Sequence, residues 1–121
     1  MLVKEITMDK GIVVTEFGGY VRRVIHPRTV GSELLAMSVL ILNPGQEHIR
    51  HQHEFEECIF TISGTGTMDA ECEDGSFVPV ELEKYKFIYI PPNVKHGPYH
   101  NTGQEPLICL CGIAPPPAYK E

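Results

Sequence analysis

The side chains best suited to chemistry lie in one stretch, from Gly45 to Gly64. His51 and His53 are two residues apart, so in an extended chain both imidazoles point to the same side. Glu57 shares their odd parity and brings a carboxylate to that side if the strand continues, or bends only slightly at Glu54. Imidazoles and a carboxylate on one face suit a divalent transition metal ion. The stretch therefore predicts a metal site.

A fourth ligand must come from another part of the chain, and His96 is the best candidate because it follows the turn-forming run Pro91-Pro92-Asn93. Three imidazoles and one carboxylate leave two positions open on a six-coordinate ion for water, dioxygen or a chelating substrate. Zinc, iron, nickel and copper accept imidazole, and the carboxylate favours manganese or iron. We expect one divalent transition metal ion, manganese, iron, zinc or nickel, without a choice among them.

The rest of the chain predicts strands that position these side chains. Short β-prone runs bounded by glycine, proline, asparagine or aspartate cover residues 12–17, 20–25, 35–42, 67–72, 77–82, 85–90 and 107–113. Gly18-Gly19 predicts a tight hairpin turn between the first two runs, and Asp74-Gly75 predicts another hairpin. No window shows the apolar period of an amphipathic helix. The predicted fold class is all-β.

Composition limits the partners. The chain has 121 residues, enough for one domain, and a formal charge of −6, which argues against binding nucleic acid or an anionic membrane. The longest apolar run, residues 34–42, is too short to cross a bilayer, and the N-terminus lacks a signal-peptide pattern. We therefore expect a cytoplasmic protein whose four cysteines stay reduced. Cys58 directly follows Glu57, so it has the wrong parity to share the metal face.

The spacing of the metal stretch is similar to the first motif of the cupin superfamily. Every marker position of that motif is filled, by Gly45, His51, His53, Glu57 and Gly64. The second cupin motif is matched less closely. Pro91 and His96 fit it, Tyr85 and Asn93 stand at its two glycines, and His100 stands at its asparagine, with Asn101 one step late.

The resemblance implies a cupin-type double-stranded β-helix, a jelly-roll barrel, with the metal on His51, His53, Glu57 and His96. We expect a single domain over residues 1–121, with a core at about 34–113, N-terminal strands at 12–25 and a Pro-rich tail at 114–121. Small cupins commonly pair, so we also expect a homodimer.

Other pocket residues follow from the same resemblance. His48 stands where oxalate-decarboxylating cupins carry an arginine that holds the substrate, so that activity loses support; Arg50 is expected on the outer face. His100 shares the parity of His96 and is a candidate proton shuttle, the alternative being a solvent position with Asn101 in the structural role. Tyr99 is a candidate hydrogen-bond donor to a bound oxyanion, as are Tyr85 and Tyr89.

The resemblance implies a metal-dependent enzyme that acts on a small oxygen-rich molecule such as a carboxylate, a sugar, a phenol or a diketone. Dioxygenase, isomerase, cyclase and lyase reactions all fit this site. The alternative is a non-catalytic module that uses its metal to bind or sense a small ligand. An acid or base close to the metal would distinguish the enzyme, and the candidates are His100, Tyr99 and His48.

Overall fold

The computed structural model describes residues 1–116, and strands make up most of its regular structure. A single 3-10 turn, η1 (Met8–Lys10), precedes the strands. In chain order the strands are β1 (Ile12–Val14), β2 (Tyr20–Ile25), β3 (Ala36–Leu42), β4 (Glu47–His48), β5 (Glu56–Ser63), β6 (Gly66–Glu71), β7 (Phe77–Leu82), β8 (Phe87–Ile90), β9 (His96–Asn101) and β10 (Leu107–Ala114). Over the described residues, no helix has the length and apolar character needed to span a membrane.

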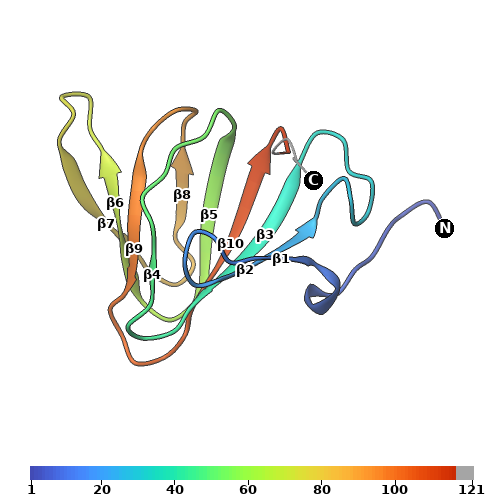
Figure 1. The fold of residues 1–121 in the computed structure, drawn as a ribbon, viewed down its shortest axis with the longest axis horizontal. Helices are drawn as coiled ribbons and strands as arrows, with labels where there is room; N and C mark the ends of the chain where they lie inside the picture. The colour runs from blue at the N-terminus through green and yellow to red at the C-terminus, as the bar shows by residue number, and fades with distance from the viewer. Residues whose placement is uncertain (117–121) are drawn as a thin grey trace.

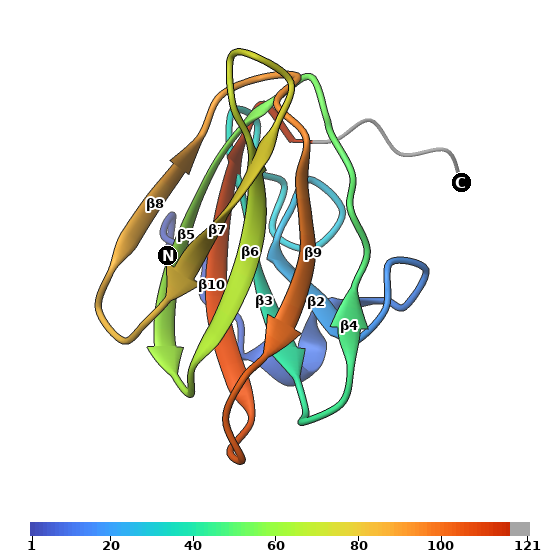
Figure 2. The same ribbon diagram turned by 90° about the vertical axis from the view of Figure 1, so that its left-hand side faces the viewer.

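The strands form two antiparallel sheets. The larger sheet has the order β1-β2-β3-β10-β5-β8, and the smaller has the order β4-β9-β6-β7. Figure 1 shows the smaller sheet to the left of the larger one, with β1 and β2 extending the larger sheet to the right. In the turned view the smaller sheet lies in front of the larger one (Figure 2). Two facing sheets of this kind confirm the predicted all-β barrel.

The core lies between the sheets because inward side chains alternate with outward ones. Along β3 every second residue from Ala36 to Leu42 is buried, which is the period of a strand with one face on a core. Strands from both sheets contribute side chains that are almost completely enclosed, among them Leu42, Ile59, Met68, Leu82 and Leu107. Burial of apolar area of this kind is the main force that stabilises such a fold.

One predicted turn is wrong. The last pair of the two N-terminal strands is Val14 opposite Val21, with six residues between the two valines, so Gly18-Gly19 is not a two-residue turn. The loop is instead held by β4 and the residue after it. The N–H of Ile49 donates to the carbonyl of Phe17 at 2.8 Å, and Nδ1 of His48 donates to the carbonyl of Gly18 at 2.9 Å. These tertiary contacts replace the local hairpin.

All four cysteines are free. Cys109 and Cys111 are buried on β10, whereas Cys58 is exposed on the face of β5 opposite to Glu57, as its parity predicted. Of the predicted Pro-rich tail, Ala114 is the last residue of β10, and residues 117–121 lie outside the described part of the chain.

Candidate metal centre

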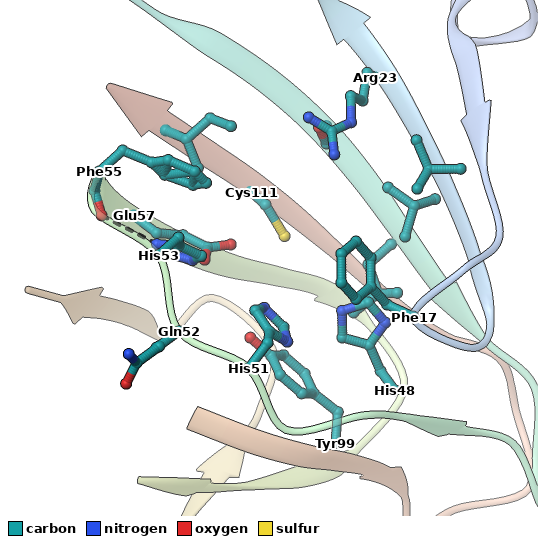
Figure 3. A pocket seen from close by; sticks show the side chains of 15 residues that line it. Phe17, Arg23, His48, His51, Gln52, His53, Phe55, Glu57, Tyr99 and Cys111 are labelled. Carbon is teal, nitrogen blue, oxygen red and sulfur yellow. Dashed lines mark hydrogen bonds and ion pairs between the residues drawn. The ribbon is translucent and has the colours of Figure 1, made fainter. Parts of the chain in front are cut away.

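Four side chains from three parts of the chain come together inside the barrel. His51 and His53 lie between β4 and β5, Glu57 is the second residue of β5, and His96 is the first residue of β9. One potential ligand atom from each lies within 4.8 Å of the others. Figure 3 shows His51, His53 and Glu57 facing one another across the lower part of the cavity. The structure thus assembles the group that the spacing of the sequence predicted.

The segment that carries the two histidines is not a continuous strand, because β5 begins only at Glu56. Backbone hydrogen bonds keep it extended all the same. His51 and His96 exchange two of them, at 2.9 and 3.0 Å, and the N–H of Asn93 donates to the carbonyl of His53 at 2.7 Å. The backbone before β9 therefore aligns His51, His53 and His96 with one another.

Each histidine of the cluster uses its Nδ1 in the same way. Nδ1 of His51 lies 2.8 Å from the carbonyl of Ile49, Nδ1 of His53 lies 3.1 Å from that of Phe55, and Nδ1 of His96 lies 2.9 Å from that of Val94. A carbonyl oxygen can only accept, so Nδ1 must carry the proton in all three rings. Each Nε2 of a neutral ring is then left with a lone pair, which is the arrangement that metal-ligating histidines use.

The lone pairs point at a carboxylate. Nε2 of His53 lies 2.8 Å from Oε1 of Glu57, and Nε2 of His96 lies 3.5 Å from the same oxygen. Nε2 of His96 is buried and has no hydrogen-bond partner among the described residues. Acceptors this close to one another repel unless a cation lies between them. That cation is either a proton or a metal ion. Ligands with bonds of about 2.1 Å stand roughly 3.0 Å apart at a right angle, so a divalent ion fits this spacing.

Burial and charge set the pKa values of the cluster. Burial alone would raise the pKa of Glu57. In the metal-free protein, a proton on Nε2 of His53 and of His96 takes the place of a metal ion beside the carboxylate, and the hydrogen bonds and charge that it supplies outweigh burial and lower that pKa from 4.5 to about 2. Burial lowers the pKa of His51 from 6.5 to about 4. At neutral pH the cluster therefore offers an ionised carboxylate and, at His51, a neutral imidazole, which are the protonation states that a metal ion requires.

A cavity of about 300 Å³ opens beside the cluster. Its walls are largely apolar and come from both sheets and from the N-terminal loop. The lining residues are Val14, Phe17, Val21, Arg23, Ser38, Leu40, His48, His51, Gln52, His53, Phe55, Glu57, Tyr99, Cys111 and Ile113. Phe55 stacks on His53 with ring centroids 3.9 Å apart, and Phe17 lies 5.4 Å from His51. The two phenyl rings flank the histidines.

Two of the three candidate catalytic residues line this cavity. His48 is buried, its ring lies 4.9 Å from that of Tyr99, and its Nδ1 bond to Gly18 leaves Nε2 as an acceptor in the neutral ring. Burial lowers the pKa of His48 and raises that of Tyr99 well above its usual value of 10. Near neutral pH, His48 can therefore accept a hydrogen bond or a proton, and the phenol of Tyr99 can donate a hydrogen bond.

The structure places His100 outside the cavity, which is the second of the two alternatives considered from the sequence. Its side chain is 46% exposed on the outer face, where Nδ1 lies 3.5 Å from Oε2 of Glu47. The cause is a bulge in β9. Met68 pairs with Tyr99 and Ala70 pairs with His96, so three steps along β9 oppose two steps along β6. The extra residue reverses the parity, which turns Tyr99 inward and His100 outward.

Asn101 supports the alternative considered for His100. Its Nδ2 donates to the carbonyl of Leu42 at 2.9 Å and to that of Glu105 at 2.7 Å. Its Oδ1 accepts the N–H of Gly103 at 2.8 Å. These bonds tie the end of β9 to β3 and to the loop that leads to β10. Asn101 therefore has the structural role one step later than the motif places it.

The expectation for Arg50 is confirmed. This residue lies on the outer face, where Nε donates to the carbonyl of Gly97 at 2.8 Å and the guanidinium covers the ring of Phe77. Sequence reasoning missed ten residues of the cavity wall, among them Phe17, Arg23, Gln52, Phe55 and Cys111. The signal for Arg23 was its parity, because it alternates with the outward Arg22 and shares the parity of the apolar Val21.

The fold and the site together define the class of protein: an antiparallel β-barrel that brings three histidines and one glutamate together beside a largely apolar cavity. The family model for the cupin domain matches residues 38–113. The chain belongs to the cupin family.

Curated relatives are distant and longer than this chain. Protein SchB of Streptomyces halstedii is 31% identical over 86 residues, which cover 71% of this chain and 59% of that protein. Polyketide synthase CurC of Streptomyces cyaneus is 29% identical over 105 residues, which cover 84% of this chain and 64% of that protein. Acireductone dioxygenase of Bacillus cytotoxicus is 40% identical over 57 residues, 47% of this chain and 32% of that enzyme.

Solved structures with the same fold include oxalate decarboxylases. A variant of the Bacillus subtilis enzyme superposes with a TM-score of 0.76 at 23% identity and covers 93% of this chain and 30% of that one. The formate complex of the Lactobacillus farciminis enzyme superposes with a TM-score of 0.78 at 19% identity and covers 97% of this chain and 35% of that one. At this level of identity the likeness concerns the fold alone.

Proposed function

We propose that this protein is a metal-dependent cupin enzyme that holds one divalent transition metal ion on Nε2 of His51, His53 and His96 and on the carboxylate of Glu57. The observation that carries the proposal is the orientation of the three imidazoles. Every Nδ1 is committed to a backbone carbonyl, which leaves every Nε2 as a lone pair beside an ionised carboxylate. Such a group of acceptors is stabilised by a bound cation.

When bound, the ion would supply Lewis-acid or redox chemistry to a substrate in the adjoining cavity. Manganese, iron, zinc and nickel are all compatible with three imidazoles and one carboxylate. The protein's own contribution is the surrounding wall. Phe17 and Phe55 restrict water, the phenol of Tyr99 donates a hydrogen bond to an oxyanion, and Nε2 of His48 accepts a proton from the substrate.

The reaction is a dioxygenation, an isomerisation, a cyclisation or a lyase step on a small oxygen-rich molecule. A dioxygenation is supported by the partial match to acireductone dioxygenase, and chemistry on a polyketide is supported by the partial match to a polyketide synthase protein. Each match spans less than two thirds of the relative's own length, so the substrate must be found by experiment. The homodimer and the cytoplasmic location remain predictions.

The deciding experiment combines metal analysis with a substrate screen. The protein is made without added metal and without a nickel column, its metal content is measured by mass spectrometry, and small acids, phenols, diketones and sugars are tested under air and under nitrogen. We expect about one metal ion per chain and turnover of one substrate group. A requirement for air would identify an oxygenase.

Two variants separate the enzyme from a binding module. Tyr99→Phe and His48→Gln change the cavity wall but leave the four proposed ligands in place. In an enzyme, each should retain metal and lose turnover by about 100-fold or more. In a non-catalytic module the ligand would be recovered unchanged from the wild-type protein, and the variants would alter its affinity only.

A further inference from the structure

The cavity has a second charged side chain that the metal centre does not use. Arg23 lies on β2, in the N-terminal part of the larger sheet, and its side chain lines the cavity together with Glu57 and the histidines. Figure 3 shows its guanidinium pointing into the cavity from the wall opposite His51 and His53. Among the lining residues, Arg23 and Glu57 are the two that carry a formal charge when the histidines are neutral.

The neighbours of Arg23 make its end of the cavity a hydrogen-bond donor site within apolar walls. Ser38 is its cross-strand partner on β3, is buried, and lines the same cavity, so its hydroxyl lies on the same face. Val14 and Val21 form the adjacent wall. A guanidinium has five N–H donors in a planar fork that matches the two oxygens of a carboxylate. Arg23 also interacts within the protein.

The charge balance of the cavity favours an anion. A divalent ion, the carboxylate of Glu57 and the guanidinium of Arg23 leave a net charge of roughly +2 inside the cavity. The whole chain has a formal charge of −6, so the sum of charges in the metal-loaded cavity has the opposite sign to that of the chain. A carboxylate would bring a charge of opposite sign to these largely apolar walls, which a neutral substrate would not.

We infer that the cavity takes a small organic acid with an apolar or aromatic body, whose carboxylate is bound by Arg23 and whose opposite end presents oxygen atoms to the metal. This inference rests on the proposed function, because the metal anchors the second end. The volume of about 300 Å³ is at the small end of ligand pockets and fits one ring with two short substituents. Arg23 is here a substrate-binding residue that selects the acid over neutral analogues.

A pair of probes tests the inference. Benzohydroxamate carries a metal-chelating group on a phenyl ring, and 4-carboxybenzohydroxamate adds a carboxylate at the far end of the ring. Their dissociation constants for the metal-loaded protein are measured by calorimetry. We expect the carboxylated probe to bind at least about tenfold more tightly, because charge-assisted hydrogen bonds to a guanidinium are roughly twice as strong as neutral ones.

The matched variants lie next to each other in the sequence. Arg23→Gln should abolish the preference for the carboxylate and leave the affinity for benzohydroxamate within about twofold. Arg22→Gln should keep the preference, because Arg22 points outward, where its Nη1 donates to the carbonyls of Asp9 and Gly11 at 2.7 and 3.2 Å. Arg23→Lys keeps the charge but loses the planar fork, so it should retain part of the preference. Metal content and melting temperature are measured for each variant.

The outcomes separate this inference from the proposed function. If benzohydroxamate binds only when metal is present, but its carboxylated analogue has no advantage in the wild-type protein, the role of Arg23 is refuted and the metal site stands. That role is equally refuted if Arg23→Gln, or Arg23→Lys where the first variant does not fold, keeps the full preference. If benzohydroxamate does not bind, the open metal site is refuted. Arg23 is then tested by titrating benzoate into wild type and Arg23→Gln, and equal or absent binding overturns the inference.

Discussion

The two segments that supply the metal cluster differ in how closely they keep regular strand geometry. The first, residues 45–64, carries His51, His53 and Glu57 at spacings that place all three on one side. The second, residues 85–101, carries His96 and then gains one residue relative to β6 before Tyr99. Because of this bulge, side chains before and after it follow opposite parities. The position of a pocket residue in the second segment thus depends on a feature that only the pairing of strands reveals.

The bulge also accounts for the late asparagine. The cupin motif places its asparagine four residues after the histidine, whereas here Asn101 comes five residues after His96. The extra residue lies where Gly97 has a φ of 104°, and a Cβ there would meet the backbone of Arg50 at 2.7 Å. Glycine is therefore required at this position. One inserted residue moves the asparagine by one step, preserves its hydrogen bonds and exposes His100.

Removal of a ligand from either segment should have the largest effect. His51→Ala and His96→Ala each remove one of four proposed ligands and should weaken metal binding by at least about 100-fold, more than the loss of an outer hydrogen bond to a ligand. At a metal concentration that saturates the wild type, a 100-fold weaker affinity lowers the free energy of unfolding of the variant by about 2.7 kcal/mol relative to the wild type. Competition with a chelator measures the affinity, and thermal unfolding with and without metal measures the stability.

The matched control is His100→Ala, which lies on the second segment but outside the cavity. Its metal affinity should stay within about twofold of the wild type, because its ring contacts Glu47 rather than the cluster. Equal losses in His96→Ala and His100→Ala would contradict the division between the inner and outer faces of β9. Full metal occupancy in His96→Ala would remove it from the ligand set.

Acid should destabilise the metal-free protein through the first segment. In the folded state the pKa of His51 is lowered from 6.5 to about 4 and that of Glu57 from 4.5 to about 2. The unfolded chain therefore binds these protons more readily, and stability is lost as the pH falls from about 6.5 to 4 through His51 and from about 4.5 to 2 through Glu57. Between pH values of about 6.5 and 4, the free energy of unfolding should fall by an amount on the order of 1 to 3 kcal/mol.

Urea unfolding of metal-free protein at several pH values tests this. His51→Gln removes the imidazole that is kept neutral by burial, so its stability should change less than that of the wild type between pH values of about 6.5 and 4. Glu57→Gln should still lose stability between pH values of about 6.5 and 4, but not between about 4.5 and 2. A wild-type stability that does not change between these pH values would show that His51 is more accessible to water in solution than in the structure.

Two residues of the second segment stand at glycine positions of the motif and have left-handed backbones. The φ of Tyr85 is 70° and that of Asn93 is 63°. Asparagine tolerates this region, but tyrosine does not, and such a position costs of order 1 kcal/mol or more. Because Tyr85 is 69% exposed, its side chain gives little compensating burial. Tyr85→Gly should therefore raise the free energy of unfolding by about 1 kcal/mol.

Asn93 provides the comparison for Tyr85. Asn93→Gly should change stability by less than about 0.5 kcal/mol, and Asn93→Ala should lower it by about 1 kcal/mol, because alanine lacks the tolerance of asparagine for a positive φ. Chemical unfolding of the three variants measures these differences. A loss of stability in Tyr85→Gly would mean that the contacts of its ring with Phe60 and Lys84 outweigh the backbone strain.

Local rules in the sequence were sufficient for the strands and for the spacing of three clustered side chains, and the resemblance to the cupin motifs implied the barrel. Short apolar runs bounded by turn residues predicted strands such as β3 and β10, and the spacing of His51, His53 and Glu57 placed three ligands on one side. Three other features could not be predicted because they depend on contacts between distant segments. These are the docking of Phe17 and Gly18 on the β4 region, the bulge in β9, and the entry of Arg23 into the cavity.

The smallest effect is expected for His100→Asn, which restores the residue of the family motif. Had His100 faced the cavity, this change would lower turnover and alter its dependence on pH. The structure instead places the ring on the outer face, 3.5 Å from a carboxylate oxygen of Glu47, in a contact that is exposed and worth less than about 1 kcal/mol. Asn101 already makes the structural hydrogen bonds at the end of β9. His100→Asn should therefore leave metal content, turnover and its pH profile unchanged, and alter stability by less than about 0.5 kcal/mol.

Tyr99→Phe, at the neighbouring inner position, is the contrasting variant. Steady-state kinetics of the two proteins across neutral pH shows which of the two side chains acts in the cavity. A drop in turnover for His100→Asn alone would show that β9 has a different register when substrate is bound.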